Sequence, residues 1–460
     1  MKDLREFLTV LEEKNELLRV KEELETRFEI AAFMRILIER GNDSAVLFEN
    51  VKGHGSPVAG NILGTKKRLA YAFGVTEQEL GETYLERRVK PMEPQVVKDG
   101  PVKEVIITKD ADILKELPVL IHHEKDAGPY FTCSTAVAKD PETGERGVGL
   151  HRIQVKGKDK LGIFLATPPL SRFLAKAEKS GKPLEIAIVN GVDPITFFGS
   201  VVWAPGGEDK FAIASGLAER PLQLVKCETV DLEVPAHAEF VLEGHITPGE
   251  REEEGPFGES TGYYLAYNNP VINVKAITRR KKPLYHALLP FSPEEGVLLD
   301  FSWEMDNLKA TRKEFPCIRK VHMTELGMVA KVQIQKDHEE NSRQIIDYFF
   351  NQPFVKLVIV VDEDVNIYNT NEVLWAVATR TKPLDDVVVK GDLPGLMIDP
   401  TTPGGEFSPE HLHMIVPRTS KLGIDATKPL QDRESFEKVD LPGNVRVKIG
   451  EIVKKYTNTK

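Results

Sequence analysis

The chain of 460 residues is 41% hydrophobic and 29% charged, and its formal net charge at pH 7 is −10. This length predicts two or three domains with cores of their own, and the acidic balance argues against nucleic-acid binding, which needs concentrated Lys and Arg. Because the chain has no apolar run long enough to span a membrane and no signal-peptide core at Met1–Glu6, we expect a cytoplasmic protein without a membrane span.

Helix and strand patterns in the first hundred residues predict an α/β domain. Asp3 can cap a helix that runs to about Asn15. Thr26 and Glu29 have the spacing of a capping box for a second helix, which Gly41 would end. Three further segments are expected here: a strand at Ala45–Phe48, a helix at Lys66–Phe73 and an aperiodic linker at Pro91–Pro101.

The middle and final thirds of the chain have different patterns. From Thr132 onward, short β-rich runs alternate with Gly- and Pro-rich turns, which predicts a barrel or sandwich core. These runs are Arg152–Lys156, Leu161–Leu165, Leu184–Val189 and Val271–Ile277. The last third returns to an α/β pattern, with strands at Met328–Ile334 and Val355–Val361 and helices at Glu340–Phe350 and Thr370–Arg380.

The segment Arg251–Tyr264 concentrates four carboxylates, three glycines and a proline. We interpret it as a shaped loop, because it is too punctuated for a helix and too acidic for a buried strand. Glu254 and Glu259 bracket Gly-Pro-Phe-Gly, which could hold two carboxyl groups at a defined separation for acid/base chemistry. The alternative is a solvated acidic turn, against which Phe257 argues because it places an apolar ring there.

Two cationic positions also have the surroundings of a binding site. Arg152 follows the glycines Gly147 and Gly149 on a predicted strand, where its guanidinium could hold a carboxylate by two hydrogen bonds. The alternative is a surface Arg after a hairpin turn. Lys421, within Ser420–Thr427, is compatible with a phosphate-binding lysine or with an exposed turn.

The histidines and cysteines do not predict a metal site. His122 and His123, like His411 and His413, lack the i, i+4 spacing of helical zinc ligands. The three cysteines are Cys133, Cys227 and Cys317, and their wide spacing supports neither a disulfide framework nor a thiolate zinc site. We expect each cysteine to be a small buried residue.

Together these stretches resemble the UbiD family of decarboxylases, which use prenylated flavin mononucleotide (prFMN). The resemblance covers nearly the whole chain and is carried by Leu4–Leu8, Asp140–Gly144, Leu224–Cys227, Asp231–Ala236, Val241–Gly244, Glu254–Glu259, Leu374–Ala376 and Ser420–Thr427. It implies an N-terminal α/β domain at 1–115, a split β-barrel that binds the flavin at 116–312, and a C-terminal α/β domain at 313–460. The last domain would mediate assembly into a homodimer or homohexamer.

The resemblance also implies a catalytic triad of Arg152, Glu254 and Glu259. The implied reaction is the reversible, non-oxidative release of carbon dioxide from an α,β-unsaturated or aromatic acid. Glu259 would protonate the carbon left behind, Arg152 would orient the substrate carboxylate and the flavin, and Glu254 would fix the geometry of Arg152. A flavin prenyltransferase would supply the cofactor.

The flavin contacts implied by the resemblance are Thr132, Gly149, Leu150, His151, Arg152, Pro168, Pro169 and Lys421. The family's divalent metal ligands would fall at Gly147, at Leu170 or Ser171, and at Lys210. None of these residues is a usual ligand of a divalent cation, so we expect no metal there. Lys210 could instead supply positive charge to the flavin phosphate.

Two alternatives remain open at this point. The chain could be a cofactor-poor structural subunit of a multi-subunit carboxylase of the same family, although the intact triad argues against this. The residues alone also allow a carboxylate-pair hydrolase such as a glycosidase, although only 7% of the chain is aromatic. The substrate cannot be read from candidate pocket residues such as Tyr285, His286 and Phe291.

Overall fold

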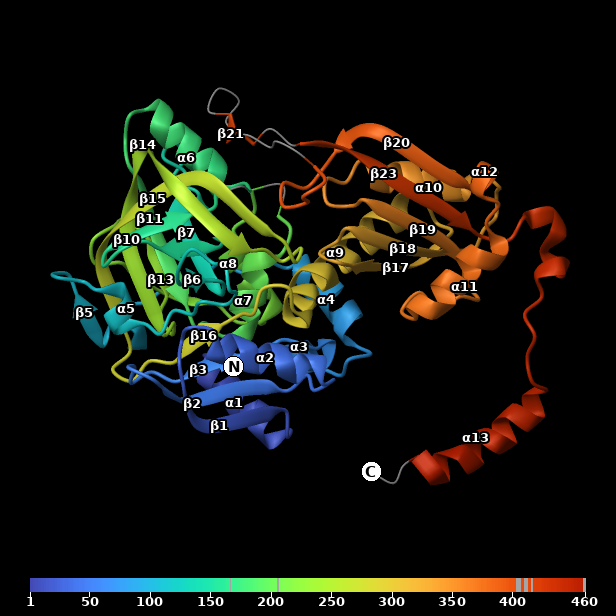
Figure 1. The fold of residues 1–460 in the computed structure, drawn as a ribbon, viewed down its shortest axis with the longest axis horizontal. Coiled ribbons are helices and arrows are strands. Elements are labelled where there is room, and N and C mark those ends of the chain that lie inside the picture. Colours follow the sequence, from blue (N-terminus) through green and yellow to red (C-terminus); the bar gives the residue numbers. More distant parts are fainter. Residues whose placement is uncertain (166, 205–206, 403–406, 409–412, 415–416, 458–460) are drawn as a thin grey trace.

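The computed structural model describes residues 1–165, 167–204, 207–402, 407–408, 413–414 and 417–457. Three larger sheets with their helices confirm the multidomain α/β class (Figure 1). The first sheet belongs mainly to the N-terminal region, the second is the curved central sheet, and the third lies in the C-terminal region. No helix among the described residues is long and apolar enough to cross a membrane.

The N-terminal region builds a four-stranded sheet in the order β1-β2-β3-β16. The confirmed Asp3 cap accepts hydrogen bonds from the backbone N–H groups of Arg5 and Glu6 at 3.1 and 3.0 Å. The elements are α1 (Leu4–Glu13), β1 (Leu17–Leu24), α2 (Glu29–Glu39), β2 (Ala45–Val51), β3 (Val58–Gly60), α3 (Lys66–Phe73), α4 (Leu80–Arg88) and β16 (Tyr285–Ala287).

The start of α2 differs from the predicted capping box. The cap position is Phe28, with a φ of 70° and no side-chain cap, and the Glu29 carboxylate instead accepts from the backbone N–H of Glu25 at 2.8 Å. Thr26 is held elsewhere, because its carbonyl accepts from the backbone N–H of Ile121 at 3.1 Å. The end of α2 is as predicted, since Gly41 follows it with a φ of +74°, which favours glycine.

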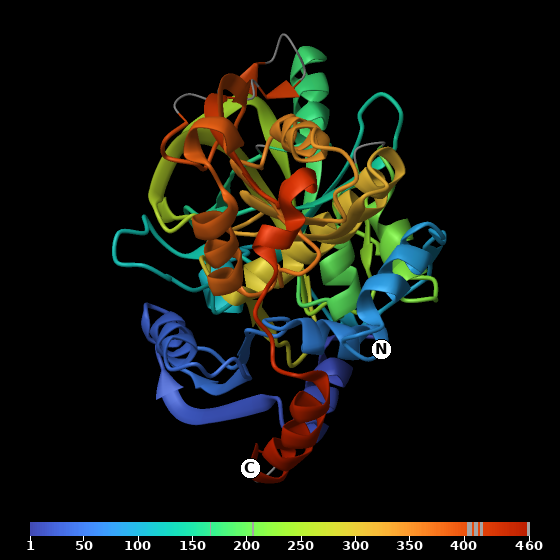
Figure 2. The same ribbon diagram turned by 90° about the vertical axis from the view of Figure 1, so that its right-hand side faces the viewer.

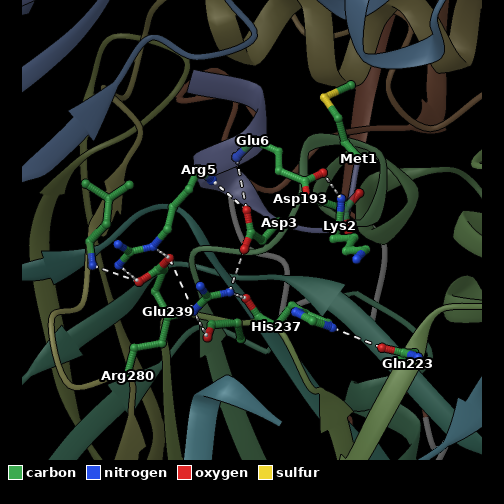
Figure 3. Close-up of polar contacts among 12 residues, drawn as sticks. Met1, Lys2, Asp3, Arg5, Glu6, Asp193, Gln223, His237, Glu239 and Arg280 are labelled. Carbon is green, nitrogen blue, oxygen red and sulfur yellow. Dashed lines mark hydrogen bonds and ion pairs between the residues drawn. The ribbon is translucent and has the colours of Figure 1, made fainter. Parts of the chain in front are cut away.

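Figure 3 shows how α1 is tied to the central sheet. Glu239, which directly precedes β14 (Phe240–Gly258), is fully buried and accepts from Nε and Nη2 of Arg5, both at 2.7 Å. Arg280 follows β15 (Tyr264–Arg279) and pairs with Asp3 at 3.0 Å and with Glu239 at 3.5 Å. Helix α1 is therefore tied to the residue before β14 and to the residue after β15.

The central sheet has the order β6-β9-β10-β15-β14-β11-β7-β8, with β5 paired to β15, and it curves into a partial barrel (Figure 1). The predicted β-rich runs are confirmed as strands. The remaining elements are β5 (Val105–Ile107), α5 (Ile113–Glu116), β6 (Tyr130–Phe131), β7 (Ser134–Lys139), β8 (Arg146–Leu150), β9 (Ile153–Val155), β10 (Lys160–Ile163), α6 (Leu170–Lys179), β11 (Leu184–Asn190), α7 (Pro194–Val201) and α8 (Lys210–Leu217).

The prediction of a loop at Arg251–Tyr264 is wrong for the first half of this segment, because the residues up to Gly258 form the end of strand β14. Acidic residues are tolerated in this strand because cationic side chains form ion pairs with them. Glu252 pairs with Lys160 at 2.6 Å, and the buried Glu254 pairs with Arg152 at 2.6 Å. Only the short connection after Gly258 is a turn.

The predicted linker Pro91–Pro101 also takes part in a sheet. It contains β4 (Gln95–Val96), which pairs with β12 (Gln223–Lys226), and β12 pairs in turn with β13 (Glu233–Pro235). The short 3-10 helix η1 (Pro101–Lys103) follows. Backbone pairing was not detectable in this segment because its Pro and Lys residues have no strand periodicity.

The C-terminal sheet has the order β17-β18-β19-β23-β20. The predicted strands and helices of this region are confirmed, whereas Ser420–Thr427 lies largely in a strand rather than an exposed turn. The elements are α9 (Pro293–Glu314), β17 (Ile318–Thr324), β18 (Val329–Ile334), α10 (Asn341–Phe350), β19 (Leu357–Asp362), α11 (Thr370–Arg380), α12 (Pro383–Asp386), β20 (Val387–Pro394), β21 (Phe407–Ser408), β22 (His413–Met414), β23 (Arg418–Ala426), η3 (Leu430–Phe436) and α13 (Gly443–Thr457).

The predicted domain boundaries at 115 and 312 do not coincide with the edges of the sheets. Strand β5 precedes residue 115 but pairs with β15 of the central sheet, and β16 joins the N-terminal sheet from beyond residue 280. Helix α9 runs through residue 312. At the other end, α13 stands away from the rest of the chain in Figure 1, and in the view of Figure 2 it overlaps the N-terminal region.

Candidate functional site

The structure brings together Arg152, Glu254 and Glu259. Glu254 Oε2 accepts from Nη2 and Nε of Arg152 at 2.6 and 3.2 Å, and Glu259 Oε1 accepts from Nη1. Their relative exposures are 8%, 0% and 6% respectively. The alternatives of a solvated acidic turn and of a surface arginine are therefore wrong. Arg152 directly precedes β9, and the two carboxylates lie at the end of β14 and directly after it.

The spacing of the two glutamates depends on an irregularity in β14. The register with β15 shifts between Glu254 and Phe257. Gly255 has a φ of +111°, and a Cβ there would lie 2.7 Å from the Cα of Ala266, so the close approach of the two strands requires glycine. The register shift is a β-bulge, and on either side of it the carboxyl groups of Glu254 and Glu259 both contact the guanidinium of Arg152.

Aromatic rings surround the Arg152 guanidinium. Its central carbon lies 4.6 Å from the ring centre of Phe164, 5.2 Å from Phe257 and 5.6 Å from Tyr267. Phe257 also packs against Tyr130 at 4.3 Å, which explains the apolar ring inside the acidic segment. The rings exclude water and strengthen the charge interactions inside the cluster.

The cluster holds two carboxylates and one guanidinium, so an added proton is readily accommodated. Burial raises the pKa of Glu259 above its usual value, and the neighbouring charge of Arg152 opposes this effect. Glu254 Oε2 also accepts from Asn269 Nδ2 at 2.8 Å. Glu254 Oε1 and the hydroxyl of Tyr130 are buried with no hydrogen-bond partner among the described residues. Burial, with a contribution from the nearby charge of Glu254, raises the pKa of Tyr130.

Asp126 is a site residue that the sequence reasoning missed. Its buried carboxylate accepts from the backbone N–H groups of His123 at 2.8 Å and of Gly258 at 2.9 Å. The backbone N–H of Ala127 donates to the carbonyl of Pro256 at 2.8 Å. A loop far away in the sequence thereby fixes the segment between the two glutamates. No sequence motif marks this aspartate, because most of its partners are backbone N–H groups, with Nδ1 of His123 3.6 Å away.

The residues implied as flavin contacts lie near this cluster, with one exception. Gly149 and Leu150 end β8, and His151 follows them, with its Nδ1 3.0 Å from the carbonyl of Phe164. Burial, with a smaller contribution from the charge of Lys210, lowers the pKa of His151 to about 4, although the hydrogen bond to Phe164 opposes the shift. Thr132 follows β6, which pairs with β9, and Pro169, just before α6, lies 3.0 Å from where a Cβ of Gly147 on β8 would be.

Lys421 is the exception. It lies on β23 in the C-terminal sheet and is 2% exposed. Its Nζ donates to the carbonyls of Phe350 and Gln352 at 2.8 and 2.5 Å. The hydrogen bonds of the described residues do not connect it to the Arg152 cluster.

The positions that correspond to metal ligands hold no metal-binding set. A Cβ at Gly147 would lie 2.4 Å from the ring of Phe173, so there is no room for a liganding side chain. Ser171 Oγ is buried without a partner in the described structure, and Leu170 is apolar. Lys210 is the first residue of α8, and its Nζ donates to the carbonyl of Ser200 at 3.0 Å.

The sequence predicted no metal site among the histidines and cysteines, and it predicted buried cysteines. Within these residues there is no group of three or more His, Cys, Asp or Glu side chains placed to hold a metal ion. His411 lies outside them, and only the backbone of His413 is described. Cys133 and Cys317 are buried as expected, whereas Cys227 is partly exposed.

Comparisons with known proteins agree with this architecture. Residues 8–88, 95–293 and 298–426 match the N-terminal, Rift-related and C-terminal domain models of UbiD, described as 3-octaprenyl-4-hydroxybenzoate carboxy-lyase. The chain is 35% identical to anhydromevalonate phosphate decarboxylase from Methanothermobacter thermautotrophicus, a match that covers 95% of this chain and 99% of that protein.

Two similar enzymes have solved structures. The UbiD-class enzyme HmfF from Pelotomaculum thermopropionicum, in complex with FMN, has a TM-score of 0.88 and 40% identity over 98% of this chain and 99% of that one. An evolved dimeric form of HmfF in complex with prFMN has a TM-score of 0.85. Vanillic acid decarboxylase from Sedimentibacter hydroxybenzoicus, in its closed form, has a TM-score of 0.85 and 31% identity over 99% of each chain.

We predict that Asp126→Asn lowers the free energy of unfolding at pH 7 by about 1–3 kcal/mol, because an amide nitrogen would face backbone N–H donors. Hydrogen bonds from His123 and Gly258 lower the pKa of Asp126 although burial opposes this. The wild-type advantage should therefore be complete above pH about 4 and should be lost as the pH falls through the lowered pKa.

Denaturant titration of both proteins between pH 3 and 7 tests this prediction. Glu124→Gln, an exposed carboxylate in the same loop, is the matched control and should change little. Equal stability of Asp126→Asn and wild type at pH 7 would contradict the prediction.

Proposed function

This chain belongs to the UbiD family of carboxy-lyases, and we propose that it uses prFMN to decarboxylate an α,β-unsaturated or aromatic acid, reversibly and without oxidation. The observation that carries the proposal is the buried Arg152 guanidinium held between Glu254 and Glu259. The FMN and prFMN complexes of HmfF support the flavin. The relatives named for anhydromevalonate phosphate and vanillic acid indicate which acids to test first.

The mechanism follows from the charge balance of the cluster. The substrate carboxylate binds Arg152 at Nη1 and displaces Glu259, while Glu254 keeps its two bonds to Nε and Nη2. Prenylated flavin, when bound, supplies an electron-accepting ring system for the electrons left by the departing carbon dioxide. Without the charge of Arg152, the buried Glu259 loses the interaction that lowers its pKa and becomes protonated. It then donates this proton to the substrate carbon.

We propose that the flavin is held by Thr132, Gly149, Leu150, His151, Arg152, Pro168 and Pro169, with Lys210 next to its phosphate. Lys421 remains a prediction from the resemblance alone. Burial, together with the nearby charge of Arg88, lowers the pKa of Lys210 to about 8. Lys210 forms no ion pair within the described part of the chain. A partly buried cation without a counter-ion is suited to bind a phosphate, and it would make a divalent metal unnecessary.

We also propose that the protein is a homo-oligomer joined through α13. Val445, Ile449, Ile452 and Tyr456 follow one face of this helix at spacings of four, three and four residues, with exposures from 40% to 82%. The helix carries four basic residues and one glutamate, whereas the whole chain has a net charge of −10. This charge complementarity favours a second copy of the chain as the surface that covers α13. A cytoplasmic location and supply of prFMN by a flavin prenyltransferase remain predictions.

The function is tested with protein co-expressed with a flavin prenyltransferase, by absorbance and mass spectrometry of the bound flavin and by carbon dioxide release. We expect bound prFMN and turnover of an acid from the classes named above. Glu259→Gln should retain the flavin but lose roughly a hundredfold or more in turnover, because an amide cannot donate the proton. A folded protein without flavin would favour the structural-subunit alternative, and full activity of Glu259→Gln would refute its role as acid.

We predict that flavin binding depends on Lys210 and not on a metal. Lys210→Met should weaken FMN binding roughly tenfold or more, because the phosphate loses its charged partner. Titration of FMN into wild type and variant, each with and without EDTA, measures this effect. Lys156→Met, which removes a cation paired with Glu252 instead, is the control. An EDTA-sensitive wild type, or a Lys210→Met variant that binds equally well, would defeat the proposal.

Deletion of residues 437–460 should reduce the oligomer to smaller species, because α13 would no longer cover its partner surface. Light scattering coupled to size-exclusion chromatography measures the mass, and circular dichroism checks that the truncated chain stays folded. Ile449→Ser with Ile452→Ser should act in the same direction as the deletion. An unchanged mass for both variants would show that another surface holds the copies together.

A further inference from the structure

Phe291 combines a left-handed backbone with an exposed aromatic ring. Its φ is 55°, in a region that a bulky residue rarely adopts, and the residue is 52% exposed. The two other candidate pocket residues of this segment, Tyr285 and His286, are each only 1% exposed. Residues held in sparsely populated backbone conformations are concentrated at ligand-binding and catalytic sites, which directs attention to what this ring contacts.

Hydrogen bonds on both sides of Phe291 fix this conformation. Arg35, on α2, donates from Nη2 to the carbonyl of Pro290 at 2.8 Å and from Nη1 to the carbonyl of Phe291 at 2.6 Å. The backbone N–H of Phe291 donates to Oε2 of Glu295 at 2.6 Å. The central carbon of the Arg35 guanidinium also lies 5.5 Å from the centre of the Phe291 ring. The fold therefore sets the position of the ring before any ligand binds.

The ring lies against the turn that follows the proposed acid, Glu259. A Cβ added to Gly262 would lie 3.5 Å from the end of the Phe291 ring, and the backbone N–H of Gly262 donates to the carbonyl of Glu259 at 2.8 Å. Glu295, which accepts from the N–H of Phe291, also accepts from the hydroxyl of Ser260 at 2.6 Å. Glu295 thereby joins the segment before α9, which carries Phe291, to the turn after β14, which carries Glu259.

The polar groups around Phe291 favour an apolar ligand group over a second anionic one. Glu259 and Glu295 are both carboxylates, and the two terminal nitrogens of Arg35 donate to backbone carbonyls. A phosphate bound against Phe291 would face the two glutamates and would exchange water for a phenyl ring, which is unfavourable for a charged group. An aromatic or alkenyl group would instead pack on the ring and be removed from water with it.

We propose that Phe291 is a specificity-determining residue that packs against the body of the substrate and favours an aromatic or apolar α,β-unsaturated acid over one that carries a phosphate. The proposal rests on the proposed function, in which Arg152 binds the substrate carboxylate and Glu259 protonates a substrate carbon. A substrate that contacts both side chains extends toward the turn after Glu259, where the Phe291 ring lies. Phe291 takes no part in proton transfer and acts on binding.

The binding of two carboxylates of different size tests the proposal without turnover. We expect Phe291→Ala to weaken benzoate binding to the prFMN-loaded protein roughly tenfold, because the benzoate ring loses its packing partner. Acetate binding should change by less than about twofold, because acetate is too small to extend beyond Arg152. Phe291→Tyr keeps the ring and should bind benzoate as wild type does. Isothermal titration calorimetry measures the benzoate affinity, and competition with benzoate measures the acetate affinity.

Tyr368→Ala is the matched control for this test. Tyr368 is 49% exposed and its ring also lies near cations, Lys66 and Lys320, but it stands between β19 and α11 in the C-terminal region. This variant should bind benzoate as wild type does. A Phe291→Ala variant that binds benzoate as tightly as wild type, or that loses as much affinity for acetate as for benzoate, would overturn the proposal. So would a wild type that binds benzoate no more tightly than acetate.

Turnover by the prFMN-loaded protein separates this proposal from the proposed function. We expect wild type to have a higher kcat/KM with substituted benzoates than with an alkenoate that carries a phosphate. Phe291→Ala should raise the KM for the benzoates roughly tenfold and change kcat less than about threefold. A wild type that prefers the phosphorylated acid would overturn the role of Phe291 and leave the proposed function intact. A wild type that binds benzoate but turns over no acid of either class would instead count against the function.

Discussion

The site depends on Arg152, whose single guanidinium satisfies two carboxylates that the central sheet has removed from water. Desolvating three ionisable groups is unfavourable unless each has close partners, and here β9 and the end of β14 supply them. The pairing leaves one more carboxylate than cation. In the proposed mechanism, the substrate carboxylate takes the place of one glutamate at the arginine, and the displaced glutamate, buried and without a cation, holds a proton.

The rest of the structure holds this cluster in place from several directions. Asp126 fixes the segment between the glutamates, and Glu239 joins the start of β14 to the N-terminal helix. The C-terminal region also reaches the β14–β15 hairpin, because Thr261 Oγ1 and the hydroxyl of Tyr267 donate to the carbonyls of Ile398 and Met397, both at 3.0 Å. All three regions of the chain therefore contact the hairpin that carries Glu254 and Glu259.

Much of the fold was predictable where the signal is local. The Asp3 cap, the glycine after α2 and the apolar strand at β19 each follow from a few neighbouring residues. The strand character of Arg251–Gly258 was missed because its acidic residues are compatible with a strand only through Lys160 and Arg152, about a hundred residues earlier. Such pairings are set by tertiary structure and leave no trace in the local pattern.

In the candidate site, too, some residues could be identified from the sequence and others only from the tertiary structure. The resemblance to a known family pointed to Arg152, Glu254 and Glu259, and the structure places them in contact. It could not indicate Asp126, which accepts hydrogen bonds from backbone N–H groups of a distant segment. Lys421 shows the opposite case. Its sequence context was compatible with phosphate binding, but it lies on β23 of the C-terminal sheet, and its Nζ donates to the carbonyls of Phe350 and Gln352 at the end of α10.

The most direct test of this account is a crystal structure of the prFMN-loaded wild-type protein with benzoate, an aromatic carboxylate, bound at the site. The account predicts that the benzoate carboxylate takes the place of Glu259 at Nη1 of Arg152, while Glu254 keeps its bonds to Nε and Nη2. If Arg152 keeps both glutamates and the benzoate carboxylate binds elsewhere, the central claim that this guanidinium exchanges Glu259 for the substrate is contradicted.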